Sequence, residues 1–214
     1  MAALAFSFDE LTHTYRDASG LVLPSVTQVL KDNGFINFDR VAPAVLERKR
    51  RLGKLVHELT EAYDNGDGFE NFEIPDAVMP YCEGWANFCW DSGFKPVITE
   101  HRMVGEIHRM CFGMTLDVEG ELNGETYIIE KKCGATESPV WGLQTAAYDL
   151  GRFKKPTCKR AAVQLGPQFK RNYKLFPYEE PTDYQIFAAA LAQTIWKQNH
   201  NIFTLEPIPE REAI

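Results

Sequence analysis

The sequence lacks the features of several large protein classes. Its apolar runs fall well short of the roughly 20 residues that cross a membrane, and residues 1–8 lack the basic start and long apolar stretch of a secretory signal. The five cysteines are odd in number and contain no Cys-x-x-Cys spacing, which argues against a disulfide framework or a zinc knuckle and favours a reducing compartment. We therefore expect a soluble, cytoplasmic protein.

Positive charge is also scarce. The chain has 23 Lys and Arg against 30 Asp and Glu, a net charge of −7. A generally basic nucleic-acid-binding surface is thereby excluded, and any contact with phosphate must use a local patch or a metal ion. Neither a G-x-G-x-x-G nor a G-x-x-x-x-G-K-[ST] phosphate loop occurs. The 44% hydrophobic and 25% charged residues are ordinary globular values, and 214 residues suit one domain.

Hydrophobic periodicity and turn residues predict a mixed α/β protein. A small hairpin is expected over 6–15 and 21–23 around a turn-rich break at 17–20, and Ser25 begins a helix by capping-box spacing. Further helices are predicted at 25–33, 43–63, 76–91, 139–150 and 182–200, and strands at 97–104, 111–122, 125–130, 159–165 and 173–176. This order predicts a central mixed β-sheet flanked by helices rather than a doubly wound dinucleotide fold.

Two acidic residues end neighbouring apolar stretches. Asp117 and Glu130 are separated by an Asn-Gly turn, so antiparallel pairing would bring their carboxylates together, a plausible seat for Mg²⁺ or Mn²⁺. Lys132 would share the face of Glu130, where its ammonium could hold a water or a developing oxyanion, while Lys131 would point the other way. The alternative is an exposed edge strand with ordinary charges.

The long predicted helix carries a second polar group. Gly53, His57 and Glu61 follow one another at four-residue spacing, and Arg50 extends the same face with a charge suited to phosphate. Gly53 is unfavourable within a helix, so either a packing reason or the close approach of another group is expected there. A solvated helix face with a structural histidine is the alternative. The cations around this point would form a basic strip that binds DNA, or else an ordinary solvated helix face: Arg48, Lys49, Arg50, Arg51 and Lys54.

Gln144 and Tyr148 share one face of the helix after the Lys132 strand, where an ordinary amphipathic pair is the alternative. Taken in order, these motifs resemble the PD-(D/E)xK nuclease superfamily in its RecB-like and phage exonuclease branch. The matching pattern is G-x3-H-x3-E on a helix, G-x3-D, I-[DE]-x-K-x-G and Q-x3-Y, and it spans Gly53 to Tyr148. The resemblance implies a restriction-endonuclease-like core over 41–200 of a single 1–214 nuclease domain, with 1–40 as an N-terminal elaboration.

The resemblance also implies roles for individual residues. His57, Asp117, Glu130 and the Lys131 carbonyl would bind one or two Mg²⁺ or Mn²⁺ ions, with Glu61 as an outer ligand. Glu100, at a predicted strand end, is a weaker candidate still.

By the same resemblance, Asp117, Glu130 and Lys132 would be catalytic. Gln144 and Tyr148 would orient the site and contact DNA, with Arg50 and Lys54 as further substrate-binding residues.

Two departures from the family pattern bear on these expectations. Leu116 replaces the proline of the motif name, a harmless change in a strand. Some relatives hold an iron–sulfur cluster through three cysteines after the Q-x3-Y helix, but only Cys158 lies beyond Tyr148, so no cluster is expected.

The activity implied is that of a metal-dependent deoxyribonuclease, an exonuclease on linear duplex or single-stranded DNA in recombination, repair or processing. The alternatives are a structure-specific endonuclease and a catalytically inactive DNA-binding or interaction module. Phage relatives often work beside a single-strand annealing protein, in the host cytoplasm when phage-encoded. The oligomeric state is left open.

Overall fold

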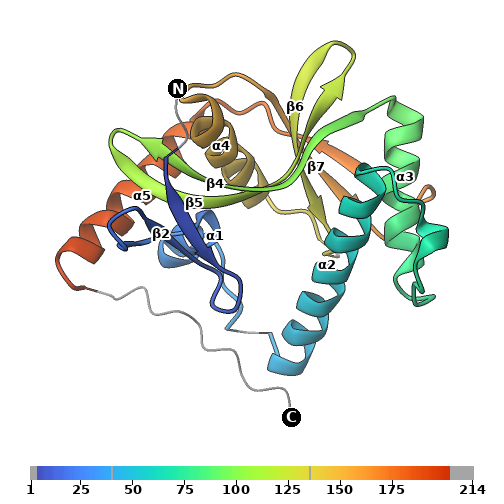
Figure 1. Ribbon diagram of the computed structural model, residues 1–214, viewed down its shortest axis with the longest axis horizontal. Coiled ribbons are helices and arrows are strands. Elements are labelled where there is room, and N and C mark those ends of the chain that lie inside the picture. The colour runs from blue at the N-terminus through green and yellow to red at the C-terminus, as the bar shows by residue number, and fades with distance from the viewer. Residues whose placement is uncertain (1–3, 40, 135, 203–214) are drawn as a thin grey trace.

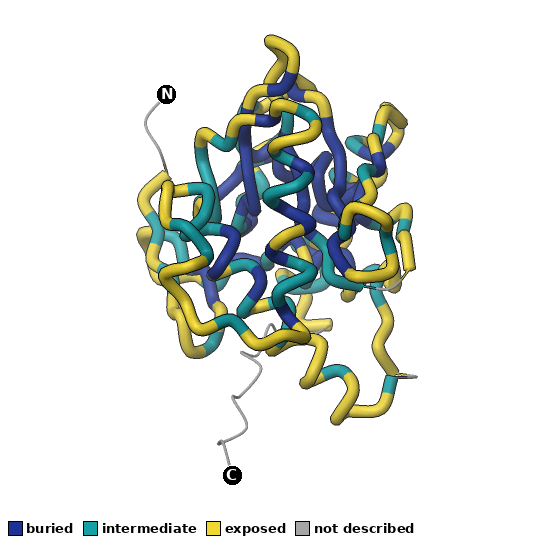
Figure 2. Tube along the Cα trace, turned by 90° about the vertical axis from the view of Figure 1, so that its right-hand side faces the viewer, coloured by how far each residue is buried: buried dark blue, intermediate teal, exposed yellow. Residues whose placement is uncertain are grey.

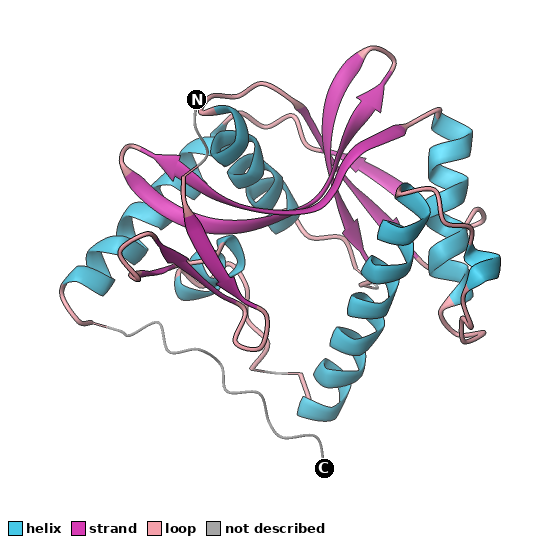
Figure 3. Cartoon of the chain, viewed as in Figure 1, coloured by secondary structure: helices cyan, strands magenta, loops and turns pink. Residues whose placement is uncertain are grey.

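A computed structural model describes residues 4–39, 41–134 and 136–202. The expected boundary at residue 40 lies outside the described residues. The described chain forms a five-stranded sheet with helices against both faces and a small three-stranded sheet beside it (Figures 1 and 3). The predicted α/β class with a central mixed sheet flanked by helices is confirmed. None of the helices within the described residues is long and apolar enough to cross a membrane.

The large sheet has the order β4-β5-β6-β7-β8 and the small sheet the order β1-β2-β3. The strands are β1 Phe6–Asp9, β2 Thr14–Asp17, β3 Val22–Leu23, β4 Lys95–Ile107, β5 Met110–Leu122, β6 Glu125–Lys132, β7 Lys159–Leu165 and β8 Tyr173–Pro177. The helices are α1 Val26–Asp32, α2 Pro43–Asp64, α3 Met79–Ser92, α4 Val140–Phe153 and α5 Thr182–Asn199, with a short 3-10 turn η1 at Phe69–Asn71.

Only the β6–β7 pair in the large sheet is parallel among the described strands. Parallel neighbours need a crossover, and α4 provides it, which places α4 against one face of the sheet. Two hydrophobic cores result. On one face α1, α4 and α5 bury Leu30, Leu143 and Phe187 against the sheet, and on the other α2 and α3 bury Val56 and Trp85.

Strand β5 changes face near its middle, and the neighbouring strand β4 is irregular at the same level. Leu116 belongs to the core under α4 and α5, whereas Val118, two residues later, belongs to the core under α2 and α3. On a regular strand these two side chains would share a face. On β4, the consecutive residues Thr99 and Glu100 both contact α2, and Glu100 has the left-handed φ of 43° that turns two successive side chains to one side.

The small sheet packs on β5 through Tyr15. The Tyr15 hydroxyl and Thr115 Oγ1 are 2.7 Å apart, and the Gly113 backbone N–H donates to the Pro24 carbonyl at 2.9 Å. A Cβ atom at Gly113 would overlap the Tyr15 ring, so a glycine is required there. The first predicted strand is in fact two strands, β1 and β2, joined by a turn.

Helix α2 is packed only along its second half. Its buried residues begin at Val56, and the preceding turns are mostly exposed (Figure 2). The close approach expected at Gly53 is wrong for the described residues, because a Cβ atom there would meet no atom within 4 Å. The helix predicted to end near Gly151 continues to Phe153, since Gly151 is instead an internal contact with Met114 and Phe112 on the sheet.

Candidate metal centre

The two predicted carboxylates lie opposite each other on adjacent strands. The pairing of Val118 with Ile129 places Asp117 on β5 across from Glu130 on β6. Both residues are buried, at 6% and 3% exposure. The backbone N–H of Lys131 donates to Asp117 Oδ2 at 2.8 Å, which fixes the orientation of the Asp117 carboxylate.

Lys132 and Gln144 enclose Glu130 from the side of α4. Lys132 Nζ lies 2.6 Å from Glu130 Oε1 and donates to Gln144 Oε1 at 3.0 Å. Gln144 Nε2 donates to Glu130 Oε1 at 2.7 Å and lies 2.7 Å from the Tyr148 hydroxyl. The second oxygen, Glu130 Oε2, is buried and has no hydrogen-bond partner among the described residues.

His57 approaches the same place from α2. Its Nδ1 is 2.7 Å from Glu100 Oε1, and its Nε2 is 3.8 Å from Asp117 Oδ2. The ligand atoms of His57, Glu100 and Asp117 all lie within 4.8 Å of one another. This triad includes Glu100, which the sequence offered only as a weak candidate at a strand end before the Asp117 strand.

The backbone conformation of Glu100 explains how it reaches His57. The pairs Thr99–Val118 and His101–Leu116 set Glu100 opposite Asp117 across the β4–β5 ladder. Its φ of 43° costs about 1–2 kcal/mol for a residue with a Cβ atom. Strain of this kind is concentrated at functional sites, and here it accompanies the convergence of three side chains.

Charge repulsion at the centre is visible in the direction of the pKa shifts. Burial, together with the carboxylate of Glu130, raises the pKa of Asp117 to about 7. Burial opposes the charged form of His57, but the carboxylates of Asp117 and Glu100 outweigh it and raise the pKa of the imidazole. Burial also opposes the charged form of Glu100, yet His57 and Lys131 lower the pKa of its carboxyl group.

The remaining predicted ligands lie around this triad. Glu61, one turn after His57 on α2, is half-buried, and burial and then the Glu100 carboxylate raise the pKa of its side chain. Among the described residues, Glu61 forms no hydrogen bond or ion pair with the triad. The Lys131 side chain points away from Lys132, toward α2 and α3, and is 1% exposed. The role of its carbonyl oxygen as a ligand stays a prediction.

The predicted substrate-binding residues fall into two groups. Arg50 and Lys54 are exposed on α2, and Lys54 Nζ is 3.9 Å from Glu58 Oε1. Gln144 and Tyr148 are buried, at 8% and 4% exposure: Gln144 contacts Glu130 and Lys132, and Tyr148 accepts a hydrogen bond from Gln144.

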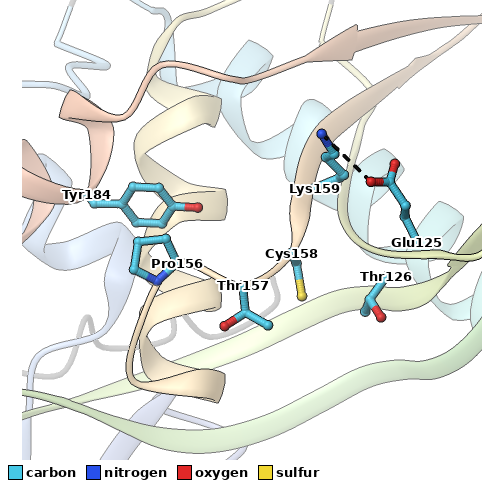
Figure 4. A pocket seen from close by; sticks show the side chains of 7 residues that line it. All are labelled: Glu125, Thr126, Pro156, Thr157, Cys158, Lys159 and Tyr184. Atoms are coloured by element: carbon cyan, nitrogen blue, oxygen red, sulfur yellow. Dashed lines mark ion pairs between the residues drawn. The ribbon is translucent and has the colours of Figure 1, made fainter.

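A separate pocket of about 410 Å³ lies at the opposite end of β6 (Figure 4). It is lined by Glu125, Thr126, Pro156, Thr157, Cys158, Lys159 and Tyr184. Burial raises the pKa of the Cys158 thiol to about 12, so this cysteine is not a thiolate nucleophile at neutral pH.

Comparison with known proteins adds little. No family model matches the sequence, and no significant match exists among curated proteins. Solved structures with some similarity include SSO0001, 16% identical with a TM-score of 0.37 over 73% of each chain. An alkaline exonuclease (LHK-Exo) from Laribacter hongkongensis is 15% identical with a TM-score of 0.38, over 83% of this chain and 92% of that one. The structure of the same exonuclease in complex with dAMP is 15% identical with a TM-score of 0.31, over 84% of this chain and 93% of that one.

Proposed function

We propose that this protein is a divalent-metal-dependent deoxyribonuclease that hydrolyses phosphodiester bonds, with an exonuclease on linear DNA favoured over an endonuclease. The observation that carries the proposal is the convergence of His57, Glu100 and Asp117 beside Glu130, whose buried Oε2 lacks a hydrogen-bond partner among the described residues. Buried acids held this close repel one another unless a cation lies between them. A buried polar atom without a partner fits an ion that would complete its contacts.

The proposed cofactor is Mg²⁺ or Mn²⁺, as one or two ions. Carboxylate oxygens suit both ions, and an imidazole completes the donor set. His57, Glu100, Asp117 and Glu130 would hold the ion, with Glu61 and the Lys131 carbonyl as further ligands. When bound, such an ion polarises a phosphate group and lowers the pKa of a water.

Lys132 is the residue that we propose acts on the reacting groups. Its ammonium carries three N–H donors, and the described contacts with Glu130 and Gln144 use two of them. With a side chain 22% exposed, it retains access to solvent and to a bound phosphate. The third donor can orient the attacking water or stabilise negative charge that develops on the phosphate. Gln144, held by Tyr148, positions this lysine from behind.

DNA would approach over the exposed half of α2. Cations there contact phosphates without reading sequence, which suits a nuclease acting on any DNA end. Arg50 and Lys54 lie one to two turns before His57, so a strand held by them leads toward the centre. This local basic strip compensates for the net charge of −7, which would otherwise repel DNA. A role in recombination, repair or processing beside a single-strand annealing protein is the setting we propose.

The test is digestion of end-labelled linear DNA with Mg²⁺, with closed-circular DNA in parallel. We expect the linear substrate to be degraded, the circle to survive and EDTA to stop the reaction. Lys132→Ala should lower the rate by about 100-fold or more, because it removes a donor to the developing charge. Lys159→Ala is the matched control: an exposed lysine at the other end of the sheet, expected to retain wild-type activity.

The outcomes separate the alternatives. Rapid nicking of closed circles would favour an endonuclease. Absence of cleavage, absence of Mn²⁺ binding by calorimetry and unchanged DNA affinity in EDTA would favour a non-catalytic DNA-binding or interaction module. Wild-type turnover by Lys132→Ala would remove Lys132 from the proposed mechanism.

A further inference from the structure

Behind the metal centre lies a second charged group that no role described so far explains. The Lys131 side chain is fully buried on the face of the sheet covered by α2 and α3. Its Nζ donates to Thr60 Oγ1 at 3.0 Å and lies 5.3 Å from the centre of the Trp85 ring. Burying an ammonium costs several kcal/mol unless it is paired, and an apolar side chain of similar size would serve the packing at least as well.

The ammonium is paired with two carboxylates. Lys131 Nζ is 3.3 Å from Glu100 Oε1 and 3.8 Å from Asp64 Oδ2. Asp64 is itself fixed: the Trp85 indole N–H donates to its Oδ1 at 2.6 Å, and the Thr99 hydroxyl donates to its Oδ2 at 3.2 Å. Lys131 is therefore held at a fixed position by residues of α2, α3 and β4.

The link to the metal centre runs through one oxygen atom. Glu100 Oε1 lies 2.7 Å from His57 Nδ1 and 3.3 Å from Lys131 Nζ. The backbone N–H of Lys131 also donates to Asp117 Oδ2. One residue thus contacts the two acidic members of the triad, Glu100 by its side chain and Asp117 by its main chain. Both described partners of the Glu100 carboxylate lie on Oε1, so Oε2 is not committed to either.

We propose that Lys131 is a positioning residue of the centre, whose buried ammonium holds Glu100 against His57 so that the second carboxylate oxygen serves a divalent ion. This inference rests on the proposed metal-dependent function. Lys131 then fixes a metal ligand from the buried face of the sheet, and Lys132 acts on the reacting groups from the solvent-accessible side. Partners that orient a metal ligand without touching the ion commonly contribute about 10–100-fold to metal affinity.

The experiment is calorimetric titration of Mn²⁺ into the folded wild-type protein and its variants at pH 7.5. We expect Lys131→Met to weaken Mn²⁺ binding by about 10–100-fold. Because this variant leaves Asp64 buried without its cation, the double variant Lys131→Met with Asp64→Asn is made as well. The Asn amide oxygen still accepts from Trp85, so the double variant should recover folding stability but not Mn²⁺ affinity. Lys159→Met is the control for loss of one positive charge.

Making Lys131→Met in a Glu100→Gln protein distinguishes a positioning role of Lys131 from a merely structural one. There the Lys131→Met change should alter Mn²⁺ affinity by less than about threefold, because the ligand that it orients has already been lost. Suppose that wild type binds Mn²⁺ and that the Lys131→Met, Asp64→Asn double variant binds it with an affinity within threefold of wild type. The positioning role is then overturned while the proposed function stands. If wild type binds no Mn²⁺, the proposed function fails and this inference fails with it.

Discussion

Asp117 gives the sharpest prediction about stability. Its pKa is raised from 3.8 to about 7, first by burial and then by the Glu130 carboxylate. The native state therefore holds the proton more tightly than the unfolded chain does. The contribution of the protonated Asp117 carboxyl group to the free energy of unfolding is fully present below about pH 4. It falls as pH rises and is lost above about pH 7. A shift of about 3 pH units corresponds to at most about 4 kcal/mol of lost stability at pH 8 in the absence of metal.

The Asp117→Asn variant removes this loss, because a neutral amide has nothing to ionise and its oxygen can still accept from the Lys131 backbone N–H. In EDTA, the variant should gain stability relative to wild type as pH rises from 5 to 8, by up to about 3 kcal/mol in guanidinium unfolding. Mn²⁺ should then stabilise wild type and leave the variant unchanged, since the ion requires the carboxylate. A stability difference that is the same at both pH values would refute this reasoning.

Two glycine substitutions with opposite expected signs test the packing around the centre. Gly53→Ala should stabilise the protein by about 0.5–1 kcal/mol in denaturant unfolding, because its Cβ atom meets nothing within 4 Å and alanine favours the helix; a loss of stability would show a contact that the structure lacks. Gly113→Ala should destabilise it by about 1–3 kcal/mol, because the added methyl group overlaps Tyr15 and must push the small sheet away; wild-type stability would show that the small sheet is not seated on β5 as described.

Much of the local structure could be predicted because its signals are local. Ser25 accepts from the Gln28 backbone N–H as its capping spacing predicts. The Asn-Gly turn sets the β5–β6 register, and that register alone places Asp117 opposite Glu130. The four-residue spacing of Gln144 and Tyr148 gives their hydrogen bond. In each case the partner lies within one turn or one hairpin.

The features that sequence could not supply depend on contacts between distant elements. Glu100 joins the triad through a left-handed backbone conformation. A glutamate gives no sequence signal for that conformation, which glycine and asparagine favour. The alternation of side chains along β6 predicts that Lys131 points to the face opposite Lys132. Only the tertiary structure shows that Asp64, held by Trp85, pairs with the Lys131 ammonium there. The helix end expected at Gly151 failed because the glycine serves contact with the sheet rather than termination.

The change of face along β5 makes this single strand part of both large hydrophobic cores. Phe112 and Met114 are anchored on one side of the molecule, and Val118 and Leu122 on the other. Neither half can come apart without pulling β5 out of the other, so we expect the two halves to melt cooperatively. The candidate metal centre lies where β5 changes face, at Asp117, so partial opening of either half would reach it last.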